Sequence, residues 1–109
     1  MSVYIAKDSG TSAVTVSVAP AMAWELEEIR CHLSASATTA ENLTATIDSH
    51  LGSNFDTQYL KKAMQNVKDY ILQFERPVKF QKDDSITVGF PNTDGNTCGI
   101  EILYTARKP

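Results

Sequence analysis

The side chains best suited to metal binding or nucleophilic catalysis are few in this chain and poorly spaced for either role. The sequence contains two histidines, His32 and His50, and two cysteines, Cys31 and Cys98. Zinc sites use about four ligands, often in close pairs such as C-x2-C or H-x3-H. Cys31 and His32 are adjacent, so on a strand they would point to opposite faces. We predict neither a metal nor another cofactor, and we expect free, buried thiols, with a disulfide as the less favoured alternative.

Acidic and hydroxyl side chains give no stronger indication of an active site. Glu25, Glu27 and Glu28 cluster in sequence, but acid–base catalysis needs two groups whose surroundings separate their pKa values. Three neighbouring glutamates on a solvated face share one environment. The sequence also lacks a G-x-S-x-G nucleophile motif and a glycine-rich phosphate loop. We therefore predict that the protein is not an enzyme.

An acidic, glycine-containing loop follows the most regular alternating segment. Asn92, Asp94 and Asn96 occupy alternate positions, as at the start of a calcium loop. The glycine comes directly after Asp94 rather than at the sixth position, and no glutamate occupies the twelfth. Asp-Gly is a strong hairpin signal because both residues tolerate positive φ. The pattern predicts a tight hairpin here, and a further turn at Asp83 and Asp84.

Length and charge set limits on the class of protein. The 109 residues suit one domain, residues 1–109, and the net charge of −3 comes without a basic stripe. No apolar run approaches the roughly 18 residues that span a bilayer. The first ten residues lack the charged and apolar regions of a signal peptide. We expect a protein made in the cytoplasm that binds neither nucleic acid nor membranes.

Alternation of apolar and polar residues predicts strands in residues 13–18, 43–47 and 85–90, because a period of two places one set of side chains on one face. A further strand closes the chain. Residues 3–6 also alternate, which predicts either a short first strand or part of an N-terminal arm (residues 1–11) that docks on a neighbour. Residues 8–11 are predicted to form a turn.

Two segments fit both a helix and strands. In residues 21–36, apolar residues fall at helical spacing, but they also fit a strand with a bulge at Glu27 and Glu28. In residues 56–75, the spacing mildly favours a helix capped by Asp56. The other interpretation has strands at 58–63 and 69–74, with a turn near 65–67.

Three phrases of the sequence resemble the small jelly-roll β-sandwich proteins of tailed-phage virions, including capsid cement (decoration) proteins. They are AWELEEIRCHLSASATTAENLTATIDS, SNFDTQYLKKAMQNVKDYILQFERPVKFQKDDSITVGFPNTDG and CGIEILYT. The most recognisable part is FERPVKFQKDDSITVGFPNTDG followed by Gly-Ile-Glu-Ile. The resemblance extends over residues 21–105.

The resemblance implies an all-β fold, a jelly-roll-like β-sandwich of about eight antiparallel strands, and favours strands in both ambiguous segments. It implies a structural virion protein that bridges and stabilises capsid subunits, with the major capsid protein or other virion proteins as partners. Such proteins usually form dimers or trimers. The residues that we expect at interfaces are Val3, Tyr4, Ile5, Asn92 and Asp94.

Two other hypotheses remain open at this point. The first is a jelly-roll carbohydrate- or receptor-binding module of a phage fibre or spike, which would use exposed aromatic residues such as Tyr4, Trp24 or Tyr59. The second is a small α/β protein in which residues 21–33 and 56–74 are helices.

Overall fold

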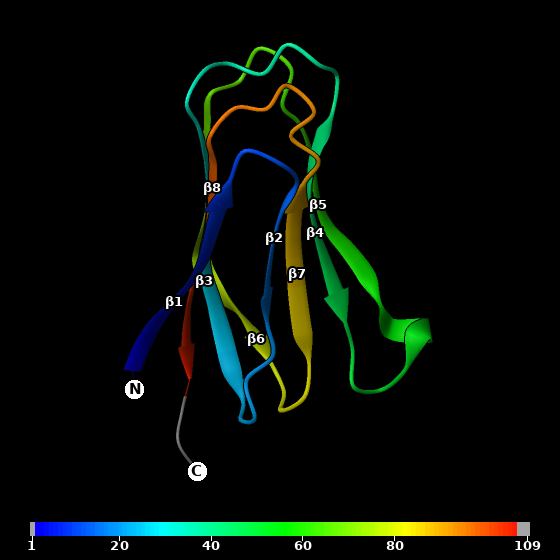
Figure 1. Ribbon diagram of the computed structural model, residues 1–109. Coiled ribbons are helices and arrows are strands. Elements are labelled where there is room, and N and C mark those ends of the chain that lie inside the picture. Colours follow the sequence, from blue (N-terminus) through cyan, green and yellow to red (C-terminus); the bar gives the residue numbers. More distant parts are fainter. Residues whose placement is uncertain (1, 107–109) are drawn as a thin grey trace.

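Two four-stranded antiparallel sheets pack face to face in the computed structural model, which describes residues 2–106 (Figure 1). The first sheet has the strand order β1-β8-β3-β6 and the second has the order β2-β7-β4-β5. This order is the jelly-roll arrangement of a β-sandwich. The strands are β1 (Ser2–Gly10), β2 (Val14–Val18), β3 (Trp24–Leu33), β4 (Asn42–Asp48), β5 (Thr57–Ala63), β6 (Asp69–Phe80), β7 (Ser85–Phe90) and β8 (Cys98–Ala106). The predicted all-β fold is confirmed, and the α/β alternative is wrong.

The links between strands cross from one sheet to the other, except for the β4–β5 hairpin, which contains the short 3-10 helix η1 (Ser53–Phe55). These links form two ends of the sandwich. The upper end in Figure 1 consists of residues 11–13, 34–41, 64–68 and 91–97, and the lower end consists of residues 19–23, 49–56 and 81–84.

The tight hairpin predicted at Asn92–Asn96 is wrong, because the two strands that flank it belong to different sheets. β7 pairs with β2 and β4, whereas β8 pairs with β1 and β3. The turn chemistry is nevertheless present, since Asn92 has a φ of 54° and Gly95 has a φ of 71°. Asn-x-x-Gly therefore makes a turn inside a crossover loop, with Gly95 donating its N–H to the carbonyl of Asn92 over 3.0 Å. Positive φ alone does not show which strands a loop joins.

Alternating apolar residues of both sheets meet in one core. β2 has the burial pattern expected from its sequence, with Val14, Val16 and Val18 buried and the residues between them exposed. β7 and β8 contribute buried residues in the same alternating way. The side chains with no more than 2% of their surface exposed include Trp24, Leu26, Ile29, Leu33, Leu43, Met64, Ile86, Val88, Ile100 and Ile102.

The segment of residues 21–36 is a strand with a bulge, as one of its two interpretations predicted. β3 shifts register against both β6 and β8 between Leu26 and Glu28. The extra residue allows Leu26 and Ile29 both to face the core, and both are fully buried. The helical spacing is therefore a consequence of the bulge, which changes an interval of two residues into three.

The helix that local spacing favoured in residues 56–75 is wrong, since the segment forms β5 and β6 in different sheets. Between them, Met64 is fully buried and its N–H donates to the carbonyl of Glu41 over 2.9 Å. Asn66 has a φ of 67°, and its N–H donates to the carbonyl of Ala37 over 2.7 Å. Both contacts are with residues distant in sequence, so tertiary packing outweighs the local helical pattern.

The first strand is longer than the sequence indicated. β1 includes residues 8–10, where a turn was expected, and it pairs with β8 from Ser2 opposite Ala106 to Gly10 opposite Cys98. Of the two alternatives for residues 3–6, the structure therefore has a strand within the same chain rather than an arm on a neighbour.

Candidate functional site

Two groups of apolar side chains are exposed at opposite edges of the sandwich. The first, which we call the β1 edge, consists of Val3, Tyr4 and Ile5, with 68%, 36% and 52% of their surface exposed. The second, the hairpin tip, consists of Leu51, Phe55 and Tyr59 on the β4–β5 hairpin. β1 is an outer strand of one sheet, and β5 is the outer strand at the opposite side of the other sheet (Figure 1).

The side chains of the β1 edge alternate between the two faces of their sheet. The ring of Tyr4 stacks on Tyr104 with 5.4 Å between centroids, and Tyr104 meets the buried Trp24 edge-on at 5.8 Å. Tyr4 thus lies on the core side of the sheet. Val3 and Ile5 then project from its outer face, where Ile5 is opposite Leu103 of β8. The backbone pairs with β8 alone, so its other side is open within the described residues.

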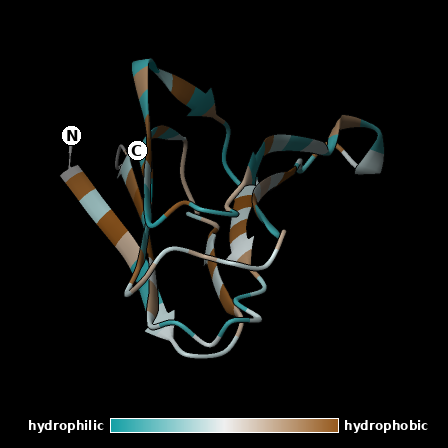
Figure 2. Ribbon diagram, turned by 90° about the horizontal axis from the view of Figure 1, so that it is seen from above, coloured by the Kyte–Doolittle hydropathy of each residue, from teal (hydrophilic) through white to brown (hydrophobic). Residues whose placement is uncertain are grey.

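The hairpin tip extends beyond the body of the sandwich. Seen from above in Figure 2, the short helix η1 and the strand ends next to it lie away from the two sheets. The Asp56 carboxylate accepts the N–H of Ser49 over 2.9 Å and closes the loop. The ring of Tyr59 contacts Phe74 of β6 edge-on, with 5.7 Å between centroids. Leu51 and Phe55 remain 61% and 58% exposed, which leaves their apolar surface available to a partner.

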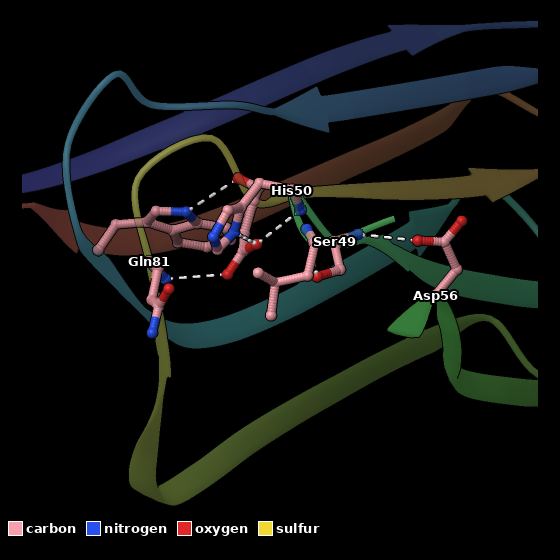
Figure 3. Close-up of polar contacts among 7 residues, drawn as sticks. Ser49, His50, Asp56 and Gln81 are labelled. Carbon is pink, nitrogen blue, oxygen red and sulfur yellow. Dashed lines mark hydrogen bonds and ion pairs between the residues drawn. The ribbon is translucent and has the colours of Figure 1, made fainter. Parts of the chain in front are cut away.

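The Asp84 carboxylate connects this hairpin to the turn between β6 and β7 (Figure 3). One oxygen, Oδ1, contacts the ring Nδ1 of His50 at 2.6 Å and accepts the backbone N–H of the same residue over 3.0 Å. The other accepts the N–H of Gln81 over 2.9 Å. The Asp84 carbonyl accepts the indole N–H of Trp24 over 3.1 Å, which joins the turn between β6 and β7 to the core. Burial raises the pKa of Asp84, but the donors from His50 and Gln81 outweigh it, and the net pKa is lowered.

The contact between His50 and Asp84 resembles part of a catalytic dyad, but nothing completes it. A nucleophile must lie within hydrogen-bond reach of the second ring nitrogen. Among the residues that the structure describes, no hydroxyl or thiol forms such a bond, and the Ser49 hydroxyl accepts the N–H of Leu51 instead. A second pair, His32 with Asp69, is exposed on the outer face of the other sheet. Within residues 2–106, no three acidic, histidine or cysteine side chains are placed to hold a metal ion.

The Asp94 carboxylate makes a comparable connection at the upper end. It accepts four hydrogen bonds, from the backbone N–H and the hydroxyl groups of Thr38 and Thr39. These donors lower the pKa of Asp94 to about 2, the Thr39 hydroxyl contributing most. The Glu41 carboxylate accepts the N–H and the hydroxyl of Thr93 in the same way. Asp94 is on the surface, its oxygens are engaged within the chain, and its interface role stays a prediction.

Asn92 does not form part of an exposed surface, which corrects the prediction for this residue. Only 3% of its surface is exposed. Its side-chain amide donates to the carbonyls of Ser12 and Asn96 over 3.0 and 2.7 Å. The asparagine was predicted correctly as a turn residue, but its φ of 54° turns the side chain beneath the loop instead of toward solvent. Asn92 therefore holds the crossover loop in place.

The two cysteines are free and buried in the core, as expected. They lie on neighbouring strands but not opposite one another, since Cys31 pairs with Ile100 and Cys98 pairs with Leu33. A diagonal pair in a sheet has its Cα atoms roughly 7–8 Å apart, beyond the reach of an unstrained disulfide. The hydrogen bond between the thiols, and then burial, raise the pKa of Cys31. The diagonal placement of the two cysteines and the raised pKa of Cys31 both favour free thiols over a disulfide.

The three residues of the β1 edge that the sequence proposed for an interface are exposed, and their interface role stays a prediction, whereas the hairpin tip was not proposed at all. Leu51 and Phe55 are isolated apolar residues in the polar segment HLGSNFD, which reads as a turn. One signal in the sequence could have identified them. Large apolar side chains in a predicted loop do not lie on the buried face of a strand, so they are expected to be exposed. Trp24, by contrast, was considered as an exposed aromatic and is 2% exposed. No helix in residues 2–106 has the length and apolar character needed to cross a membrane.

Comparisons with known proteins give matches to structures only. No protein-family model and no curated protein matches this sequence. Among solved structures, the chain is similar to Drosophila NLP-core, whose crystal structure provides insight into pentamer formation and histone binding by that protein. The identity is 15%, the alignment includes 96% of this chain and 99% of that one, and the TM-score is 0.48. It is also similar to a family 16 carbohydrate binding module-2, at 15% identity over 91% of this chain and 74% of that one, with a TM-score of 0.42.

Proposed function

We propose that this protein is a structural component of a tailed-phage virion, a capsid cement or decoration protein that bridges and stabilises capsid subunits. The observation that carries the proposal is the pair of exposed apolar surfaces at opposite edges of one sandwich, the β1 edge and the hairpin tip. A protein that bridges two bodies needs two separate contact surfaces. The resemblance of residues 21–105 to virion jelly-roll proteins supports the same role.

The mechanism is adhesion rather than chemistry. Exposed apolar side chains bury their surface when a partner covers them, which favours association, and the surplus over the lost freedom of the two partners sets the affinity. Interfaces of standard size remove roughly 1,600 Å² from water, and repeated copies on a shell add by avidity. The partners are the major capsid protein or another virion protein, and the protein acts in the virion as a homo-oligomer.

We assign the capsid contact to the hairpin tip. Leu51 and Phe55 extend beyond the sheets, and the Asp56–Ser49 and Asp84–His50 contacts fix the loop that carries them. A fixed loop loses little conformational entropy on binding, which favours affinity. The tip can therefore insert between neighbouring subunits as a preformed apolar wedge.

The test is binding to phage particles. The proposal predicts that the protein co-purifies with virions, and that capsids lacking it lose resistance to heat or chelators. The tip variant Leu51→Asp/Phe55→Asp should abolish binding to depleted capsids. The matched control is Ile71→Asp, which places a charge at an equally exposed aliphatic residue of β6, 61% exposed, and should bind normally. Absence of the protein from purified virions would contradict the proposal, as would unimpaired binding by the tip variant.

Exposed aromatic rings in the hairpin tip support a second candidate, a carbohydrate- or receptor-binding module of a fibre or spike. Tyr59 is 40% exposed and Phe55 is 58% exposed on the same hairpin. Aromatic rings with one accessible face are suited to contact with the apolar side of a sugar. This candidate predicts saturable binding on a glycan array that Tyr59→Ala abolishes. The capsid proposal predicts no such binding.

A further inference from the structure

The four outer strands of the two sheets are not equally protected against pairing with another chain. Natural sheets protect their edges by short strands, charged side chains, proline or bulges. β6 contains Pro77 between charged residues, and β5 has Lys61 and Lys62 together with a register shift against β4. β2 is only five residues long. Each of these edges therefore carries a feature that opposes pairing.

β1 lacks this protection over its first half. It is nine residues long and contains no proline, and its pairing with β8 is regular from end to end. Its charged residues, Lys7 and Asp8, come only after the β1 edge, in which Val3, Tyr4 and Ile5 are exposed in succession. Among the described strands, β1 is the one with an open backbone and a run of exposed apolar side chains. A long apolar edge of this kind is a template for a further strand.

We propose that this edge binds a second copy of the same chain. The two β1 strands pair antiparallel about a two-fold axis, and the two four-stranded sheets then form a single sheet of eight strands. A two-fold contact uses the same surface on both copies, so that surface must complement itself. The β1 edge does so when Tyr4 is opposite Tyr4 of the second copy. Val3 then lies opposite Ile5 of the second copy, and Ile5 lies opposite its Val3.

The register follows from symmetry and from the charges of β1. A two-fold axis perpendicular to the sheet keeps both outer faces on the same side, so Val3 or Ile5 can only face residues of the outer face. A shift that centres the pair on Ile5 would place Val3 opposite Lys7, and one centred on Lys7 would place like charges opposite each other, which is destabilising. Centring on Tyr4 pairs the described residues 2–6 with one another and places Val3 opposite Ile5.

This inference does not depend on the virion role, and the two are compatible. Pairing through β1 leaves both hairpin tips free at the outer edges of the dimer, because β5 lies on the opposite side of the sandwich from β1. A dimer would therefore present two tips to a shell. The paired segment is short, and interfaces below roughly 1,200 Å² are typical of weak complexes. The dimer is expected to form with rising concentration.

The first test is sedimentation velocity of the purified protein from low to high micromolar concentration. The wild-type protein should shift from monomer to dimer. Ile5→Lys should weaken self-association by roughly tenfold or more, because the two-fold axis places the new charge opposite the apolar Val3 at two equivalent positions of the contact. The matched control, Ile71→Lys, changes an exposed isoleucine at the other edge of the same sheet and should associate as the wild type does.

The second test examines the register directly and does not require loss of association. Directly opposed residues in antiparallel strands have Cα atoms roughly 4.5–5.5 Å apart, within disulfide range. Under mild oxidation, Tyr4→Cys should form a disulfide-linked dimer faster than Ile5→Cys or Ala6→Cys. The native cysteines are buried and do not compete. Far-UV circular dichroism of each variant verifies that it has folded.

The outcomes separate this inference from the proposed function. A purified protein that stays monomeric at all concentrations would overturn the dimer, even if it binds capsids through the hairpin tip. Faster cross-linking of Ile5→Cys than of Tyr4→Cys would overturn the register. Dimerisation of a protein that never binds capsids would contradict only the virion role.

Discussion

The upper and lower ends of the sandwich are each held by one aspartate, but the partners of the two carboxylates differ. At the upper end, Asp94 accepts hydrogen bonds from Thr38 and Thr39, so one surface loop is tied to another. At the lower end, Asp84 accepts from His50 and Gln81, while its carbonyl accepts the indole N–H of Trp24. The lower connection therefore runs from an exposed hairpin into the core, and the upper one stays on the surface.

Because of this difference, the position of the hairpin tip depends on the packing of the core around Trp24. Trp24 stacks on Phe80 with 4.3 Å between ring centroids, and its indole nitrogen reaches the turn that also holds His50. Leu51 of the hairpin tip is the next residue in the chain. A change in the core at Trp24 is thus expected to loosen the hairpin tip, whereas a change at Asp94 should loosen only the loop around Thr38.

The largest effect is expected at the lower end. Trp24→Phe keeps an aromatic ring in the core but removes the donor to the Asp84 carbonyl. The acceptor is partly buried, and leaving it without its partner, together with placing a smaller ring in the core, costs about 1–3 kcal/mol. We expect a loss of that size in the free energy of unfolding, measured by urea denaturation, and faster hydrogen exchange in residues 49–56.

The control for this variant is Tyr104→Phe. Tyr104 contacts the same indole edge-on, and its hydroxyl makes no hydrogen bond to another described side chain or backbone group. Removing that hydroxyl should change stability little. If Tyr104→Phe were as destabilising as Trp24→Phe, the loss of stability would not be specific to the indole N–H and its contact with the Asp84 carbonyl.

The parts of the fold that the sequence predicted are those in which local pattern and tertiary environment agree. Val14, Val16 and Val18 alternate and are buried on one face, as expected. The segment around Met64 could not be predicted from its own residues. The backbone of this segment bonds another loop, Met64 to Glu41 and both Asn66 and Val67 to Ala37, and no local period contains that information.

The strand at residues 3–6 was predicted because alternation is visible in sequence, and the interface role of Val3, Tyr4 and Ile5 stays a prediction. The environment of the loop residues could not be predicted, because it depends on where the chain crosses between the sheets. Asn92 was predicted at the surface as a turn residue, but the loop changes sheets and buries it. Leu51 and Phe55 were missed because exposure of a side chain in a loop depends on where the hairpin ends. The hydrogen bonds from His50 to Asp84 and from Thr38 to Asp94 join segments more than 30 residues apart in sequence, so local pattern does not predict them.

A smaller and more local effect is expected at the upper end. Asp94→Asn replaces one acceptor oxygen by an amide that cannot accept from Thr38 or Thr39. We expect faster hydrogen exchange at the Thr38 and Thr39 backbone amides and a loss of stability smaller than that of Trp24→Phe, because the carboxylate is on the surface. Exchange in residues 49–56 should stay unchanged, which would distinguish the two ends.

The matched control is Asp83→Asn, the same chemical change in a turn of the lower end. Asp83 has a φ of 72°, which asparagine adopts readily, and its carboxylate accepts no hydrogen bond from the other described residues. The variant should be as stable as the wild type. An equal loss in both variants would mean that net charge, not the Thr38 and Thr39 contacts, explains the result.

The smallest expected effect is the acid dependence of the upper end. The pKa of Asp94 is about 2 in the folded protein, below the unfolded value of roughly 3.9. Because the folded state binds fewer protons in this range, its stabilisation is complete above about pH 4 and is lost as the pH falls toward about 2. The gap in urea midpoint between the wild type and Asp94→Asn should therefore narrow over that range, while Asp84, whose pKa is also lowered, weakens both proteins alike. A gap that stays constant would show that the geometry of the loop, and not the charge of Asp94, holds the upper end.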